Sequence, residues 1–254
     1  MSDAPGPALT FLGHSTVLVE LDGIRILTDP VLRDRVGPLR RQAAPPHADV
    51  YDGIDAVVIS HVHHDHLDLA SLRHLRGRPL IIVPKGAASL MRQHGFHEVV
   101  ELGSGERHEV GGVAIEATPA FHGGFRAPFG PTAASLGYVI GDRNRRVYFA
   151  GDTELFSGMA DIHDINIALL PVWGWGPTLG GGHMNPERAA EALRLLRPRA
   201  AVPIHWGTLW PRGLRARRDL LVEPPRRFVA AAAELAPDVV IAPTDPGAHV
   251  DLAG

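Results

Sequence analysis

A histidine-rich hexapeptide, HVHHDH at residues 61–66, directly follows a short apolar run in this sequence. The run, DAVVIS at residues 55–60, is rich in β-branched side chains and predicts a buried strand. Leucines at helical spacing follow in residues 67–75. The hexapeptide therefore lies on a loop between a strand and a helix, where a rigid scaffold can hold side chains in a cleft.

Four side chains of this loop suit metal binding: His61, His63, Asp65 and His66. The first two, two residues apart in an extended loop, can face one ion, and the last two can turn toward a second. Imidazole and carboxylate are suitable ligands for zinc, manganese or iron. A chance cluster is the alternative, because the chain has 15 histidines, but a chance cluster predicts no partners elsewhere.

Partners do occur elsewhere, because three later apolar runs end near His122, Asp152 and His205. An earlier run, residues 24–28, ends at Asp29, which can face the same loop. Seven nitrogen or oxygen donors at strand ends are more than one tetrahedral ion uses, so they predict a two-metal site. The seven donors are His61, His63, Asp65, His66, His122, Asp152 and His205.

Composition excludes several classes of protein. The formal charge of −3, from 25 basic and 28 acidic residues, argues against a general nucleic-acid binder. The absence of cysteine removes disulfides, thiolate ligands and cysteine nucleophiles. The amino terminus lacks the features of a signal peptide, and no apolar run reaches the ~18 residues of a membrane span. We expect a soluble cytoplasmic protein, and the dominance of arginine over lysine suggests a bacterial source.

The remaining pattern alternates strands with helices and has no linker-like break, so residues 1–254 are expected to form one domain. Two similar halves, 8–150 and 151–254, predict two face-to-face sheets with helices outside. Residues 31–52 lack periodicity and either cover a cleft or form a solvated connector, which we favour. The expected strands are 9–12, 16–21, 24–28, 80–83, 98–102, two within 110–118, 135–140, 146–150, 165–171, 200–204 and 239–242, and the expected helices are 67–75, 86–94, 186–196 and 225–235.

The glycine-rich loop at residues 173–183 contains Trp173 and Trp175 and ends at His183. A third tryptophan, Trp206, follows the ligand candidate at the next strand end. We interpret the loop as one wall of a substrate pocket, in which the tryptophans stack on an apolar group and His183 contacts the polar end. The alternative is that the tryptophans plug the edge of the sheet.

The segment HVHHDHLD resembles the HxHxDH motif of the metallo-β-lactamase superfamily, and the downstream His122, Asp152 and His205 match its later motifs. Residues 11–32, 151–153, 183–189 and 201–208 are similar to one branch of that superfamily. The branch holds the N-acyl-phosphatidylethanolamine-hydrolysing phospholipase D and L-ascorbate-6-phosphate lactonase. The resemblance extends from residue 9 to about 210. It implies an α/β fold, a four-layer αββα sandwich with the metals at one edge of the two sheets.

The resemblance also implies roles for individual residues. It assigns the first metal to His61, His63 and His122, and the second to Asp65, His66 and His205, with Asp152 as the bridge. It makes Asp29 an acidic residue behind the ligands, and it places His14 and His183 at the rim or on the substrate. The segment at residues 123–137 has no clear counterpart in the branch.

The implied activity is that of a dinuclear hydrolase. Two divalent ions about 4 Å apart, zinc first with manganese or iron as alternatives, can hold a bridging water and supply hydroxide near neutral pH. Asp152 would set the metal separation, Asp65 would accept the proton, and Arg126 and His183 would contact an anionic group. The expected substrate is a small-molecule or phospholipid-like phosphodiester, phosphorylated lactone or other ester. The sequence leaves open whether the chain forms a homo-oligomer.

Three other functions fit the sequence less well. A nucleic-acid-processing enzyme would use the arginines of residues 212–227, but the slightly acidic total argues against it. A diiron redox protein on the same fold normally needs a flavin partner and a carboxylate in the ligand set, whereas this set is rich in histidine. A structural or degenerate metal protein is disfavoured by the intact set of donors.

Overall fold

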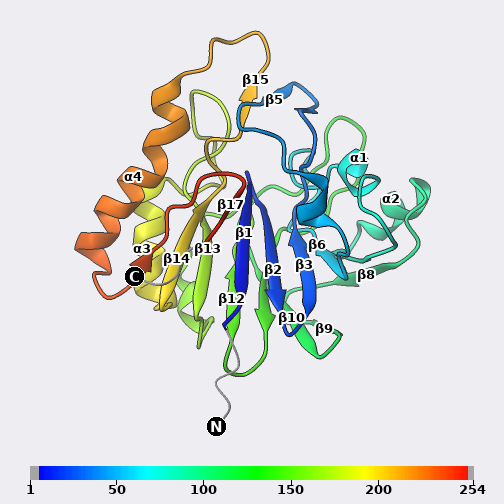
Figure 1. Cartoon of the computed structure of the whole chain (residues 1–254), viewed down its shortest axis with the longest axis horizontal. Helices are drawn as coiled ribbons and strands as arrows, with labels where there is room; N and C mark the ends of the chain where they lie inside the picture. The colour runs from blue at the N-terminus through cyan, green and yellow to red at the C-terminus, as the bar shows by residue number, and fades with distance from the viewer. Residues whose placement is uncertain (1–5, 251–254) are drawn as a thin grey trace.

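Two seven-stranded sheets form the centre of the computed structural model, which describes residues 6–250 (Figure 1). In spatial order, the first sheet contains β17 (Ala248–His249), β1 (Ala8–Gly13), β2 (Thr16–Leu21), β3 (Ile24–Thr28), β6 (Ala56–Val58), β7 (Leu80–Pro84) and β8 (Val99–Leu102). The second contains β16 (Val240–Ile241), β14 (Ala200–Ile204), β13 (Ile167–Pro171), β12 (Arg146–Phe149), β11 (Leu136–Gly141), β10 (Val113–Pro119) and β9 (Arg107–Val110).

Each sheet combines an antiparallel half with a parallel half. In the first sheet β1, β2 and β3 are antiparallel, and β3, β6, β7 and β8 are parallel. In the second, β9 to β12 are antiparallel, and β12, β13, β14 and β16 are parallel. Short connections shape the antiparallel halves, such as the turn at Asp22 and Gly23, where both residues have positive φ.

Alternation along the strands builds two hydrophobic layers. In β2, Val17 and Val19 belong to the core between the sheets, whereas Leu18 faces the outer layer under the helices. The parallel strand β6 is buried along its whole length, as expected for a strand covered on both faces. The second sheet contributes large buried rings to the central core, among them Tyr138 and Phe149.

Helices cover the outer faces, so the predicted αββα sandwich is confirmed. The first sheet carries α1 (Leu69–Leu72) and α2 (Ala88–Gln93), and α3 (Pro186–Leu196) and α4 (Arg218–Leu235) lie on the opposite side of the molecule (Figure 1). Asn185 caps α3 by accepting a hydrogen bond from the Arg188 amide, with Pro186 at the first helical position. Two 3₁₀ turns complete the set, η1 (Ala48–Tyr51) and η2 (Ser157–Asp161).

Two helix boundaries differ from the sequence prediction. The helix expected at 67–75 is only α1, because the Leu67 amide is bonded to the His63 carbonyl and the first leucine belongs to the loop. The last helix begins at Arg218, before the predicted residue 225, because Pro224 and Pro225 lie inside α4 rather than at its start. No helix within residues 6–250 is long and apolar enough to cross a membrane.

Residues 31–52 are not a solvated connector, and that preference was wrong. They contain β4 (Arg35–Val36) and β5 (Leu39–Arg41), and β5 pairs with both β4 and β15 (Leu209–Pro211) in a third small sheet at the top of Figure 1. Val31, Val36, Leu39 and Leu209 form a separate buried cluster there. The buried Arg41 holds this sheet to the main fold, since its guanidinium donates to the carbonyls of Val31 (2.9 Å) and Leu12. The segment therefore covers the sheet edge.

Candidate metal centre

The seven predicted donors meet at the edge of the sandwich where strands from both sheets end. His205 directly follows β14, and His61 and Asp152 lie within three residues of the ends of β6 and β12. His122 stands equally close to the end of β10. This is the edge where open sheets with parallel strands commonly form their binding sites.

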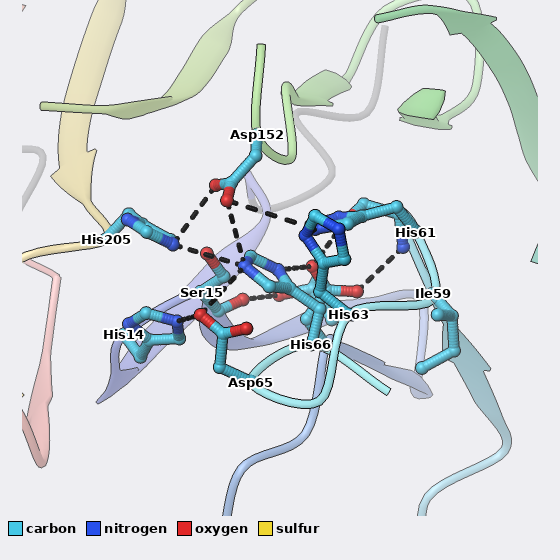
Figure 2. A network of polar contacts seen from close by, with 12 residues as sticks. His14, Ser15, Ile59, His61, His63, Asp65, His66, Asp152 and His205 are labelled. Carbon is cyan, nitrogen blue, oxygen red and sulfur yellow. Dashed lines mark hydrogen bonds and ion pairs between the residues drawn. The ribbon is translucent and has the colours of Figure 1, made fainter. Parts of the chain in front are cut away.

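Asp152 lies between two groups of imidazoles (Figure 2). Its Oδ1 is 3.1 Å from His205 Nε2, and its Oδ2 is 3.1 Å from His66 Nε2 and 4.0 Å from His61 Nε2. The side chain is almost fully buried, and its Oδ1 has no hydrogen-bond partner. A buried, ionised oxygen without a donor needs a cation or another compensating group.

The first group consists of His61, His63 and His122. His61 Nε2 is 3.0 Å from His63 Nδ1, which is itself 3.1 Å from His122 Nε2. These three nitrogens lie within 4.8 Å of one another. The spacing allows one ion to be held by all three rings.

The second group consists of Asp65, His66 and His205, with His14 beside them. His66 Nε2 is 3.1 Å from His205 Nε2 and 3.7 Å from Asp65 Oδ2. The two rings are stacked, with centroids 5.1 Å apart. Their ε nitrogens therefore point at the same small volume as the Asp65 carboxylate.

Hydrogen bonds at the far side of three rings decide which ring nitrogen is free. His66 Nδ1 is 2.6 Å from Asp29 Oδ2, and His205 Nδ1 is 2.9 Å from the carbonyl of Trp173. His122 Nδ1 is 2.8 Å from the carbonyl of Gly182. Because these oxygens can only accept, each Nδ1 donates and each Nε2 of a neutral ring presents a lone pair. Lone pairs that face one another and a carboxylate fit divalent metal ions, so the residues present match the predicted cofactors.

The pKa shifts of two first-group histidines and of Asp152 agree with this arrangement. Burial lowers the pKa of His61 well below its ordinary value, and burial lowers the pKa of His122 to about 4. Burial alone would raise the pKa of Asp152, but His205 and His66 hold that pKa well below its ordinary range. Neutral imidazole and ionised carboxylate are the forms that bind metals.

Backbone strain is concentrated at this edge. Asp29, His14 and His205 have φ angles of 33°, 55° and 61°, in the left-handed region that residues other than glycine rarely adopt. Such conformations cost free energy and persist where the surrounding structure holds them. Here the backbones of two of them are bonded together, since the His205 amide donates to the His14 carbonyl at 2.7 Å.

His14 does not lie at the rim, as the sequence analysis allowed, but beneath the second group. It is 1% exposed, and its Nε2 is 3.1 Å from Asp65 Oδ2. Its ring lies against His205, with centroids 4.0 Å apart. Burial lowers the pKa of His14 to about 3, so the neutral ring can donate its Nε2 proton to Asp65. The residue positions a ligand candidate instead of contacting substrate.

Arg126 and Trp173 also need correction as substrate contacts. The guanidinium of Arg126 is buried, and its Nη1 donates to the carbonyls of Val62 (2.7 Å) and Leu67 (3.0 Å). It therefore holds the metal-binding loop in place. Trp173 is half-buried against the central core and acts through its carbonyl on His205.

The other two tryptophans behave differently from each other. Trp206 is buried, stacks on Phe11 at 6.2 Å between centroids and donates to the carbonyl of Pro203. Trp175 is 40% exposed and lines a cavity of about 490 Å³ above the donors. Trp206 is thus packed in the core and Trp175 lines the cavity, and the stacking of Trp175 on a substrate stays a prediction.

His183 lies in the same cavity. Its Nε2 is 3.3 Å from Asp152 Oδ2, and its Nδ1 is 3.0 Å from the carbonyl of Gly181. Burial lowers the pKa of His183, but the hydrogen bond with Asp152 outweighs burial and raises that pKa above its ordinary value. When protonated, the ring can donate a proton into the cavity from Nε2.

The sequence analysis missed two supporting residues. Ser60 Oγ donates to Asp29 Oδ2 at 2.5 Å and lies 2.9 Å from His61 Nδ1. Glu154 Oε1 accepts a hydrogen bond from the Gly182 amide at 2.9 Å. Both follow or precede predicted ligands by one or two positions, and this proximity was the signal that could have singled them out.

Comparison with known proteins shows which family and which solved structures this chain resembles. The model of the Beta-lactamase superfamily domain matches residues 24–206. An N-acyl-phosphatidylethanolamine-hydrolyzing phospholipase D of Caenorhabditis elegans is 34% identical over 80% of this chain and 64% of that protein. A metal-dependent hydrolase of Methanopyrus kandleri is 32% identical over 94% of this chain and 97% of that protein. The solved structure of a metallo hydrolase from Ignicoccus hospitalis has a TM-score of 0.74 and 27% identity, and covers 96% of this chain and 97% of its own.

Proposed function

Because the chain belongs to the metallo-β-lactamase superfamily, we propose that it is a metal-dependent hydrolase that uses two divalent ions to cleave an ester-type bond. One observation carries this proposal. The ε nitrogens of His66 and His205 lie 3.1 Å apart with their other nitrogens bonded to oxygen, and both face a carboxylate of Asp152. Such a set of acceptors supports the binding of cations.

The two groups of donors divide the ions between them. His61, His63 and His122 would hold one ion, and Asp65, His66 and His205 the other. Asp152, which faces both groups, would bridge the ions and fix their separation. Zinc suits nitrogen and oxygen donors of this kind, and manganese and iron are the alternatives.

Bound metals of this type acidify a water molecule and polarise the oxygen of the reacting bond. Asp65, the carboxylate of the second group, also lines the cavity, where it would accept the proton of the attacking water. His183, which lines the same cavity, would donate a proton from Nε2 to the departing oxygen. His14 would hold Asp65 in the orientation that this transfer requires.

Two kinds of substrate are proposed from the family resemblance, a phosphodiester and a phosphorylated lactone. A cavity of about 490 Å³ lies within the size range of small-molecule sites. The C. elegans relative, by its name, hydrolyses a phosphodiester of a lipid. A small-molecule or phospholipid-like ester is therefore the substrate class to test first.

Elemental analysis combined with kinetics tests the proposal. The protein, stripped with chelator and reconstituted with zinc, manganese or iron, is expected to bind two ions per chain. It is then expected to hydrolyse bis(4-nitrophenyl) phosphate or 4-nitrophenyl butyrate, and the chelated form is not. One ion or none after reconstitution contradicts the dinuclear site, and hydrolysis unaffected by chelation contradicts a metal-dependent reaction.

A further inference from the structure

The cavity above the donors has apolar walls from three separate segments. The small third sheet contributes Val36 and Leu39, and the loop after β10 contributes Phe125. The glycine-rich loop contributes Trp175 and Leu179. The polar groups that line the cavity belong mainly to the metal centre at its floor. The walls therefore favour an uncharged part of the substrate.

Two arginines that are close in sequence to residues of the cavity lining are engaged in other interactions. Arg33 forms a bidentate pair with Asp68, with distances of 2.7 and 2.8 Å. Arg126 is buried and donates to main-chain carbonyls of the metal-binding loop. Arg33 is held by Asp68 and the Nη1 of Arg126 by main-chain carbonyls, and neither residue lines the cavity.

The third sheet turns its other arginines away. Arg35 pairs with Arg40 across the β4–β5 hairpin, and Val36 pairs with Leu39. Adjacent residues of a strand point to opposite faces, so the arginine pair faces away from the cavity that Val36 and Leu39 line. Arg41 is buried and bound to carbonyls. Among residues 6–250, no arginine or lysine lines this cavity.

We infer that the substrate carries no charged group apart from the one at the reacting bond, and that the part held by the walls is apolar. The inference rests on the proposed function and narrows it. Two metal ions can balance one negative charge at the bond, as in a phosphodiester. A second, remote anion would lie against apolar walls with no arginine or lysine among the described residues that line the cavity, and burying such a charge is costly. The inference therefore favours an apolar ester or phosphodiester and disfavours a phosphorylated lactone.

Matched substrates test the inference directly. 4-Nitrophenyl butyrate and 4-nitrophenyl hemisuccinate share the reacting bond and similar length, and differ in a remote carboxylate. The metal-loaded protein is expected to have at least about a tenfold higher kcat/KM for the butyrate, because the carboxylate loses hydration without gaining a partner. Equal or better hydrolysis of the hemisuccinate overturns the inference and leaves the hydrolase function standing.

A binding measurement keeps the two proposals separate if neither ester is hydrolysed. Calorimetric titration compares hexanamide with adipic acid monoamide, on both the metal-loaded and the metal-free protein. Tighter binding of hexanamide supports the apolar cavity even without hydrolysis, in which case only the hydrolase proposal fails. Equal affinity, or tighter binding of the monoamide, overturns the apolar assignment itself.

Variants at the walls show whether the cavity is responsible. Thr178 lines the cavity and is exposed, so Thr178→Lys can add a cation without disturbing the core. Relative to the neutral Thr178→Gln control, it is expected to shift the ratio of kcat/KM values toward the hemisuccinate by about fivefold or more, because the lysine gives the remote carboxylate a partner. An unchanged preference in both variants contradicts the placement of the substrate against this wall.

A second pair of variants uses two phenylalanines of one loop. Phe125 lines the cavity, whereas Phe129 is 96% exposed and does not. Phe125→Ala is expected to raise KM for the butyrate several-fold, and Phe129→Ala to leave KM unchanged. The same effect from both variants would show that the loop acts by its fold and not by its contact, against the inference.

Discussion

Oxygen atoms outside the seven donors fix the tautomer and the orientation of three histidines of this centre. Asp29 fixes His66, and the carbonyls of Trp173 and Gly182 fix His205 and His122. Each bond selects a tautomer and an orientation, so the lone pairs are directed before any ion arrives. A histidine at a strand end is therefore a stronger ligand candidate when its second ring nitrogen has a hydrogen-bond partner.

The first prediction concerns Asp152, whose oxygens face both groups of imidazoles. Asp152→Ala is expected to retain fewer metal ions than the wild type, and less than a tenth of its kcat/KM, which corresponds to a loss of more than about 1.4 kcal/mol of transition-state stabilisation. Elemental analysis and steady-state kinetics measure both effects. Asp161→Ala, an exposed aspartate on η2, is the control and should behave as wild type. Wild-type metal content in Asp152→Ala would contradict a bridging role.

From the sequence, the residue types that gather at the centre could be predicted, but the hydrogen-bond partners of individual side chains could not. Strand ends, which hydrophobic patterning reveals, bring His61, Asp152 and His205 together. Their assignment as ligands stays a prediction. Nothing in the sequence indicated that Nη1 of Arg126 donates to two main-chain carbonyls, because partners 59 and 64 residues away leave no pattern there. His14 was equally hidden, since its partner Asp65 is 51 positions distant.

At the level of elements, the loop at residues 173–183 is bonded to the candidate metal centre at both of its ends. Gly182 donates its amide hydrogen to Glu154 and its carbonyl accepts from His122. Its φ of 79° is left-handed, and a Cβ there would come within 2.6 Å of His122 Nδ1, so only glycine fits. The wall of the cavity and the first group of ligands are thus physically connected.

The second prediction follows from that connection. Glu154→Ala removes the acceptor of the Gly182 amide and is expected to raise KM several-fold and weaken the binding of one of the two ions, because His122 loses a fixed partner. Glu154→Gln keeps an acceptor oxygen and should stay close to wild type. Metal titration and steady-state kinetics on both variants measure the effects. If Glu154→Ala and Glu154→Gln are indistinguishable, the carboxylate does not anchor the loop.

Elements with regular patterns were predictable, whereas the cover of the site was not. The strand runs and the capped helix α3 match the structure because their periodicity and capping are local properties. The third sheet pairs β5 with β15, which are separated by more than 160 positions, and its strands are only two or three residues long. Such short strands have no detectable period, so residues 31–52 read as a connector.

Across the whole molecule, the centre concentrates buried charge at one edge of an otherwise apolar sandwich. Asp29, Asp65 and Asp152 are all buried there, with no arginine or lysine bonded to them among residues 6–250. Two divalent ions would balance these carboxylates, so the stability of the whole fold should depend on metal. In the absence of metal, only protonated histidines can replace that charge.

The last prediction is a pH dependence of the metal-free protein. Burial lowers the pKa of His66, but the carboxylates around it, led by Asp152, hold that pKa well above 6.5. The pKa of His183 is raised as well, by Asp152 against the effect of burial. A raised pKa stabilises the folded state below the unfolded value and loses that contribution as pH rises through the folded value. His14 and His122, whose lowered pKa values are about 3 and about 4, change stability only below pH 6.5.

Chelated protein is therefore expected to melt at progressively lower temperature as the pH rises above 6.5, because the protons on the raised groups are lost. Zinc-loaded protein should melt higher and change little over the same range, because the ions supply positive charge at every pH. Scanning calorimetry with chelator or with zinc measures both curves. Repeating the series at high salt screens exposed pairs but not the buried centre, so the difference should persist. A chelated protein whose melting temperature stays constant or rises across this range would show that protons on these histidines do not substitute for the metal.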